Sequence, residues 1–164
     1  MIISLNEVET VCYRAALGAG LSYGLAQDAA VIGVKLIASR ADGPAILLRA
    51  LHFAESHPMT PPVFVADDTA WHSRGGVLPS LIAGPIAADL RRANPARRIN
   101  IEATDEPAII ALCLEDCPLV PPRAPLEISS THWRQLQKFA ARTYVPASEA
   151  PRRKGAGASL LDDD

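Results

Sequence analysis

Apolar side chains recur every three or four positions through the first 57 residues, and helix-breaking residues interrupt them twice. The first segment opens with Ser4 and Glu7, three residues apart. This is the spacing of a capping box, in which the serine accepts from a free backbone N–H and the glutamate reaches back. Gly18 and Gly20 supply a stop signal, because glycine adopts the left-handed conformation that ends many helices. A helix is predicted between these signals, with an apolar face of Leu5, Val8, Cys12 and Ala15 or Ala16.

Two more helices are predicted directly after the first. Ser22 is placed to cap the second, whose apolar positions are Leu25, Ala29, Ile32 and Leu36. Its alanines and Gly33 leave little side-chain bulk, so we expect another helix to approach closely there. Asp42-Gly43-Pro44 separates the second helix from a third, which ends near His57-Pro58 because the residue before a proline disfavours helix. The pattern therefore predicts a subdomain of three helices.

Beyond residue 58 the apolar segments shorten and prolines become frequent. Val63–Ala66 has the composition of a short strand, residues 72–80 that of a loop, and residues 85–93 that of a short helix. Ile99 and Ile101 alternate with polar residues, and residues 108–114 are apolar throughout. These two segments predict a small antiparallel sheet around residues 99–114, with its turn at residues 104–107.

A last helix is predicted after Ser129, Ser130 and Thr131, which are suitable capping residues. Its inner stripe consists of Trp133, Leu136, Phe139 or Ala140, and Tyr144. The predicted fold class is α+β, with a helical subdomain, a small antiparallel sheet and a C-terminal helix. We expect one domain over residues 1–150, followed by an extended tail over residues 151–164.

Composition and charge narrow the classes of function. Hydrophobic residues make up 49% of the chain and charged residues 21%, as in globular rather than disordered proteins. The net charge of −2 gives no basic footprint, so no nucleic acid or anionic membrane surface is expected as partner. No apolar run reaches the roughly 20 residues that cross a bilayer. Glu7 and Glu9 interrupt the first apolar positions, so no leader is expected, and the predicted location is cytoplasmic.

The cysteines and histidines do not predict a metal or redox centre. Cys113 and Cys117 have a spacing found in zinc sites, but no second pair accompanies them, and Cys12 lies on a helix face. His52 and His57 are five residues apart, which places them about 140° apart around a helix. The glycines at residues 18–20 and 155–157 lack the rest of a dinucleotide or phosphate-binding motif. No cofactor and no metal is therefore expected.

The richest polar cluster of the sequence occupies residues 67–74, directly after the strand Val63–Ala66. It holds two adjacent carboxylates, an imidazole, a hydroxyl and a guanidinium, which together are the groups of acid–base chemistry and anion binding. Asp68, His72 and Arg74 are its candidate catalytic residues. One hypothesis is thus a small enzyme or ligand-binding protein that uses this loop. The alternative is an exposed loop without chemistry, because polar residues in loops need no functional reason.

Four stretches of the chain resemble an uncharacterised bacterial protein family. They are the opening SLNEVE, the turn and helix GAGLSYGLAQDAA, the helix THWRQLQKFAARTYVPASE and the tail RRKGAGASLLDDD. The family is marked by this type of N-terminus and by a tail of the form GAGAS-x-x-D-x-D. The resemblance implies a discrete family and carries over no activity, cofactor or catalytic residue.

The tail suggests a second hypothesis, in which the chain is a non-catalytic accessory protein. A basic run is followed by small residues, two leucines and three aspartates. Small residues let a backbone enter a narrow groove, leucines anchor it, and charges fix its orientation. The expected partner is another protein or a homo-oligomer. The residues expected to bind it are Arg153, Lys154, Gly155, Gly157, Leu160, Leu161, Asp162 and Asp164.

Overall fold

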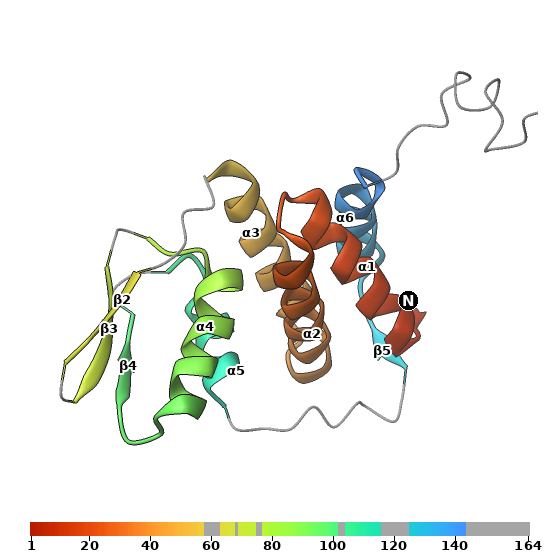
Figure 1. Ribbon diagram of the computed structural model, residues 1–164. Coiled ribbons are helices and arrows are strands. Elements are labelled where there is room, and N and C mark those ends of the chain that lie inside the picture. The colour runs from red at the N-terminus through yellow and green to blue at the C-terminus, as the bar shows by residue number, and fades with distance from the viewer. Residues whose placement is uncertain (58–62, 68, 75–76, 102–103, 116–124, 144–164) are drawn as a thin grey trace, which may run out of the picture.

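The structure is a computed structural model that describes residues 1–57, 63–67, 69–74, 77–101, 104–115 and 125–143 (Figure 1). In chain order its elements are β1 (Ile2–Ile3), α1 (Leu5–Gly18), α2 (Tyr23–Ser39), α3 (Gly43–Ser56), β2 (Val63–Ala66), β3 (Ala70–Arg74), α4 (Ser80–Ala93), β4 (Arg98–Asn100), α5 (Pro107–Leu114), β5 (Leu126–Glu127) and α6 (Ser130–Ala141). Helices dominate and the strands are short, so the predicted α+β class is confirmed.

Helices α1, α2, α3 and α6 pack side by side, and together with β1 and β5 they form what we call the helical unit (Figure 1). The three predicted N-terminal helices and the C-terminal helix are therefore confirmed. Both expected caps form: Ser4 Oγ accepts from the N–H of Glu7 at 3.3 Å, and Ser129 Oγ accepts from the N–H of His132 at 3.2 Å. The antiparallel pair β1–β5 ties the start of the chain to the start of α6.

Close helix contacts in the helical unit occur where side chains are small. A Cβ atom added at Gly33 of α2 would lie 2.8 Å from Cys12 Sγ of α1, so the glycine lets these helices approach. At the end of α1, a Cβ atom added at Gly18 would lie 2.0 Å from the backbone oxygen of Phe139 in α6. The expected close approach at Gly33 is thus present, and α6 makes a second one.

The remaining elements form what we call the sheet unit. Its three strands lie in the order β2–β3–β4, with β2 and β3 antiparallel and β3 and β4 parallel. Helix α4 connects the two parallel strands, and α5 packs against α4. Figure 1 shows α4 and α5 between the sheet and the helical unit, and both helices contact α2.

Four local predictions in the sheet unit are wrong. Residues 108–114 were expected to form a strand but lie in α5, because a fully apolar run suits a buried helix as well as a buried strand. The expected antiparallel sheet around residues 99–114 is absent, since β4 pairs in parallel with β3. His72 and its neighbours were expected in a loop but lie in β3, and α4 begins at Ser80 rather than at Pro85.

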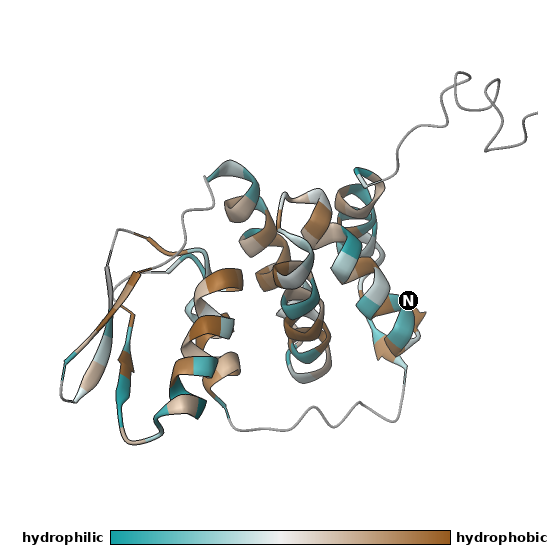
Figure 2. Cartoon of the chain, in the orientation of Figure 1, coloured by the Kyte–Doolittle hydropathy of each residue, from teal (hydrophilic) through white to brown (hydrophobic). Residues whose placement is uncertain are grey.

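Most buried apolar side chains belong to one core that fills the helical unit and extends to Leu81 of α4 and Ile109 of α5. A second, small cluster of Leu78, Ala83 and Ile110 lies within the sheet unit. Figure 2 shows brown, hydrophobic positions along both α2 and α4, the helices at the junction of the units. Among the described residues, no helix combines the length and apolar character needed to cross a bilayer.

Candidate functional site

Asp67 is a turn residue between β2 and β3. Its Oδ1 accepts from the backbone N–H groups of Thr69 and Ala70, each at 2.7 Å, and from the Thr69 hydroxyl at 3.0 Å. Its Oδ2 lies 2.7 Å from Nε2 of His72. These bonds hold the pKa of the Asp67 carboxyl well below its usual range, first through the N–H of Thr69. Asp67 is therefore a constant hydrogen-bond acceptor that shapes the hairpin.

Of the three candidate catalytic residues, the structure describes the side chain of His72 alone. The ring lies on the sheet, where its Nε2 meets Asp67 and its Nδ1 is 3.5 Å from Nδ2 of Asn100 on β4. Arg74 pairs with Val63 in the β2–β3 pair. Asp68 lies outside the described residues. The convergence of Asp68, His72 and Arg74 on one pocket therefore stays a prediction.

The described cysteines are packing residues. Burial raises the pKa of the Cys12 thiol to about 12 and that of the Cys113 thiol to about 11, so neither is a ready thiolate. A Cβ atom added at Gly84 of α4 would lie 2.8 Å from Cys113 Sγ of α5, so the glycine lets these two helices approach closely. Cys117, the other half of the C-x3-C pair, lies outside the described residues.

His52 and His57 have local partners at the end of α3. The ring of His52 lies 3.6 Å from the Glu55 carboxylate and edge-on to Phe139, whereas His57 stacks on Phe53. Within the described parts of the chain, no group of three His, Cys, Asp or Glu side chains is arranged to hold a metal ion.

A polar network surrounds the start of α4. The backbone N–H of Ser80 donates to Asp105 Oδ1 at 2.6 Å, so Asp105 caps this helix from a distant position in the sequence. Ser80 Oγ and Asp105 Oδ2 are buried, and neither atom makes a hydrogen bond among the described residues. Next in the chain, Glu106 accepts two hydrogen bonds from Arg49 of α3, at 2.5 and 3.1 Å. This network joins the two units and serves the fold.

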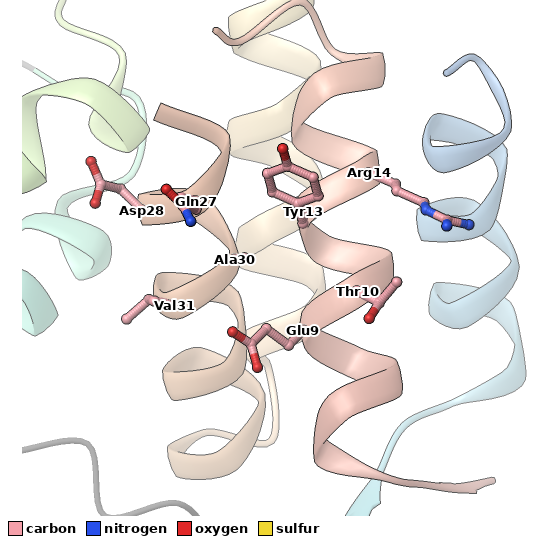
Figure 3. Close-up of a pocket in the computed structure, with 8 residues that line it drawn as sticks. All are labelled: Glu9, Thr10, Tyr13, Arg14, Gln27, Asp28, Ala30 and Val31. Atoms are coloured by element: carbon pink, nitrogen blue, oxygen red, sulfur yellow. The ribbon is translucent and has the colours of Figure 1, made fainter. Parts of the chain in front are cut away.

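An open groove of about 590 Å³ runs across α1 and α2 (Figure 3). Tyr13 and Glu9 project from α1, and Asp28 and Val31 project from α2. Figure 3 shows the Arg14 side chain extending over α6, away from Asp28. The helices form this groove because their small residues, such as Cys12, Ala29 and Gly33, are buried between them while the larger polar residues face outward. We call this hollow the α1–α2 groove.

Asp28 is the most unusual group of the α1–α2 groove. Its pKa is raised, first by burial, then by the charge of Asp89 on α4, while Arg92 acts in the opposite direction. Asp28 makes no hydrogen bond and no ion pair with another described residue. With Val31 it also lines a smaller adjoining hollow of about 120 Å³ between α2, α4 and α5. Asp28 is exposed to solvent, and Lys35 and Arg92 line this smaller hollow together with it.

Sequence reasoning missed this groove. Glu9, Tyr13 and Asp28 look like the solvated faces of two amphipathic helices, and only the crossing of α1 and α2 makes them neighbours. Polar residues at spacing i, i+4 on the outward face of each predicted helix are the one signal that pointed there, but that spacing is common on solvated faces.

Together, these features define an α+β protein with a four-helix unit, a three-stranded mixed sheet and an open polar groove. Residues 3–74 match the model of a family described as Protein of unknown function (DUF3726). The match contains the SLNEVE opening and the GAGLSYGLAQDAA helix, so this part of the chain is similar to an uncharacterised domain family, as the resemblance implied. Searches of curated proteins and of solved structures each found no match.

Proposed function

We propose that the chain is an accessory protein that acts by docking on a protein partner, and that its tail over residues 151–164 makes the contact. The observation that carries this proposal is the anchored end of α6. Arg142 pairs with Glu55 of α3 and lies over the Phe139 ring at 4.4 Å, and the Thr143 hydroxyl donates to the oxygen of Ala140. The chain thus leaves the helical unit from a fixed point.

A fixed point of departure favours docking by a short segment. A segment tethered to a rigid base loses less orientational freedom when it binds than one tethered to a mobile base. Trp133, Leu136 and Phe139 hold α6 in the main core with 3% exposure or less, so the base is rigid. The composition of the tail supplies charged groups at both ends and leucine anchors between them.

The test starts from full-length chain purified from its native cells with the proteins bound to it. A variant without residues 152–164 is compared with R134E/K138E, which changes two exposed basic residues of α6 and leaves the tail intact. Each co-purified protein is then made separately and titrated against all three chains by calorimetry. We expect affinity to fall at least tenfold for the tail deletion only. Undiminished binding by the deletion, or no partner at all, would reject the proposal.

The second candidate, a small enzyme or ligand-binding protein using residues 67–74, draws on the 2.7 Å contact of His72 with Asp67. The structural role of Asp67 in the hairpin turn weakens it, because the same bonds are expected without any substrate. A crystal structure of the full-length chain that shows the side chains of residues 67–76 tests this second candidate. Side chains of Asp68, His72 and Arg74 that converge on one pocket would support catalysis, and side chains that spread into solvent would reject it.

A further inference from the structure

A hollow of about 290 Å³ lies at one end of the sheet unit, and three arginines line it. Arg91 belongs to the last turn of α4, Arg97 precedes β4, and Arg98 is the first residue of β4. Figure 1 shows the end of α4, the end of α5 and the start of β4 together at this end of the sheet unit. We call this hollow the arginine hollow.

No carboxylate in the lining of the arginine hollow balances its positive charge. The other residues that line it are neutral: Pro95, Ala96, Ile99, Asn100 and Leu114. Asp89, an acidic residue near the same end of α4, pairs with Arg92 instead. Within the described parts of the chain, Arg91, Arg97 and Arg98 form no ion pair, so the hollow carries three uncompensated cations.

Local structure explains only part of this arrangement. Arg91 lies beside the negative end of the α4 dipole, where a cation is favourable. Arg97 lies over the Trp71 ring at 5.5 Å, which holds its guanidinium in place. Neither contact supplies a full negative charge, and Arg98 lies beyond the helix. Because like charges around one hollow repel one another, an anion between them would remove a repulsion that the fold leaves.

The arrangement of the guanidiniums favours phosphate over carboxylate. Guanidinium groups bind both anions through paired N–H···O bonds. A phosphate group has oxygens that point in several directions, whereas the two oxygens of a carboxylate lie in one plane. Here the guanidiniums come from a helix end, a loop and a strand, so oxygens pointing in several directions match them better. The Asn100 side chain adds a neutral N–H donor to the same lining.

The size of the hollow favours a small ligand. Sites for drug-sized molecules measure roughly 300–1,000 Å³, and the arginine hollow lies near the lower end of that range. Ile99 and Leu114 give it apolar surface for the carbon part of such a molecule. A nucleic-acid strand gains its affinity from many phosphate contacts along an extended basic surface. The net charge of −2 does not favour such a surface.

We propose that the arginine hollow binds a small molecule that carries a diphosphate group, with Arg91, Arg97 and Arg98 donating hydrogen bonds to its oxygens. A diphosphate group balances more of the three positive charges than one carboxylate does. The hollow is distinct from the tail and from residues 67–74, so this site goes beyond the proposed function. Its sequence signal is the run of four arginines within residues 91–98, which the overall charge conceals.

The first test titrates sodium pyrophosphate into the full-length chain by calorimetry, near pH 7 and at constant ionic strength. R91A/R98A removes two exposed side chains of the hollow, and R134A/K138A removes two exposed charges from α6 as the matched control. We expect affinity to fall at least tenfold in R91A/R98A, because charge-assisted hydrogen bonds are lost, and to stay within twofold in the control. No saturable binding by wild type, or an equal loss in both variants, would overturn the proposal.

The second test leaves every residue of the hollow unchanged. Trp133→Phe makes Trp71 the only tryptophan of the chain. Because Arg97 lies over the Trp71 ring, a ligand that binds Arg97 should change the fluorescence of Trp71. The change should saturate at the same pyrophosphate concentration as the heat of binding. Binding heat without any change in Trp71 fluorescence would place the ligand elsewhere and overturn the proposal.

Two further probes decide the class of ligand. Citrate carries its charges on carboxylates and should bind at least tenfold more weakly than pyrophosphate at the same ionic strength. Equal affinities would overturn the preference for phosphate. A short single-stranded DNA that binds more tightly than pyrophosphate, and that loses its affinity in R91A/R98A, would replace the small ligand by a nucleic-acid strand. That result would overturn the proposal as well.

Discussion

In the helical unit, Leu36, Leu47 and Leu51 are at most 1% exposed and share one continuous core with α6. In the sheet unit, the separate cluster consists of Leu78, Ala83 and Ile110, and strand β2 exposes Val63 and Val65 to solvent. Stability per residue follows buried apolar area. The helical unit is therefore the stable base of the molecule, and the sheet unit depends on its attachment to that base.

The matched family segment crosses this division. Residues 3–74 include α1, α2 and α3 but not α6, and they include β2 and β3 but not β4. Helix α6 contributes Trp133, Leu136 and Phe139 to the main core, so the matched segment without α6 leaves part of that core uncovered. The matched segment of this chain thus covers most of the helical unit and one hairpin of the sheet unit, and later parts of the chain complete both.

Weakening each core in turn tests whether the two units differ in stability. Leu36→Ala in α2 should lower the free energy of unfolding by about 2–5 kcal/mol and loosen both units, because it opens a cavity in the shared core. Ile110→Ala should loosen the sheet unit alone. The chain has two tryptophans, Trp133 in the helical unit and Trp71 in the sheet unit. Replacing Trp133 by phenylalanine leaves Trp71 as the fluorescent reporter of the sheet unit, and replacing Trp71 leaves Trp133 as the reporter of the helical unit.

Urea unfolding followed by the fluorescence of each single tryptophan gives the measurement. With Ile110→Ala, we expect the Trp71 transition to occur at lower urea than the Trp133 transition. With Leu36→Ala, both transitions should move. Equal displacement of both transitions by Ile110→Ala would show that the two units unfold as one and that the distinction between them has no thermodynamic meaning.

Gly18→Ala probes the contact of α1 with α6. The added Cβ atom would lie 2.0 Å from the backbone oxygen of Phe139, so α6 must move, at a cost of about 1–3 kcal/mol. Gly24→Ala is the matched control in α2, where no atom lies within 4 Å of the added Cβ atom. That change should stabilise the protein by about 0.5 kcal/mol through the unfolded chain. Thermal unfolding measures both; equal effects would contradict the close helix contact.

The helical unit was predictable from the sequence. In the sheet unit the strand Val63–Ala66 was predicted correctly, but the pairing of the strands and the helix α5 were not, for physical reasons. Caps at Ser4 and Ser129 and a spacing of three to four residues are local signals, and helices are local structures. Strand β3 exists because it pairs with β2 on one side and β4 on the other, which no local signal records. In α5, the apolar run has no periodicity, and its contacts with α4 decide in favour of helix.

The α1–α2 groove shows the same limit for the site. The cluster of polar residues 67–74 directs attention to His72 and its neighbour Asp67, whose contacts serve the hairpin. Glu9 and Asp28 come from different helices and belong to no motif. A groove between two helices depends on how they cross, and the crossing is set by buried small residues such as Gly33 rather than by the groove residues themselves.

Arg49 and Glu106 test the ionic connection between the units. Glu106 is nearly buried with 12% of its side chain exposed, whereas Arg49 is 59% exposed. Arg49→Ala leaves the buried Glu106 carboxylate without its hydrogen-bond partner and should lower the free energy of unfolding by about 1–3 kcal/mol. Glu106→Gln leaves a solvated guanidinium and a neutral amide, and should cost about 1 kcal/mol or less. Urea unfolding of both single variants and the double variant measures the pair. A larger loss for Glu106→Gln would contradict the burial of Glu106.

Asp28 lies where α2 of the helical unit faces Asp89 on α4 of the sheet unit. Its raised pKa means that the folded chain binds the proton more tightly than the unfolded chain. Stability is therefore gained as the pH falls toward the ordinary value of 3.8 and is lost as the pH rises through the raised pKa. Asp28→Asn removes this dependence and should stabilise the protein near pH 7 by about 0.5 kcal/mol or less.

Melting temperatures of the wild-type chain and of Asp28→Asn between pH 4 and pH 7 measure this dependence. We expect the difference between the two chains to change as the pH rises through the raised pKa of Asp28. A difference that is the same at every pH would mean that burial and the charge of Asp89 do not act on the Asp28 carboxylate at the junction of the two units.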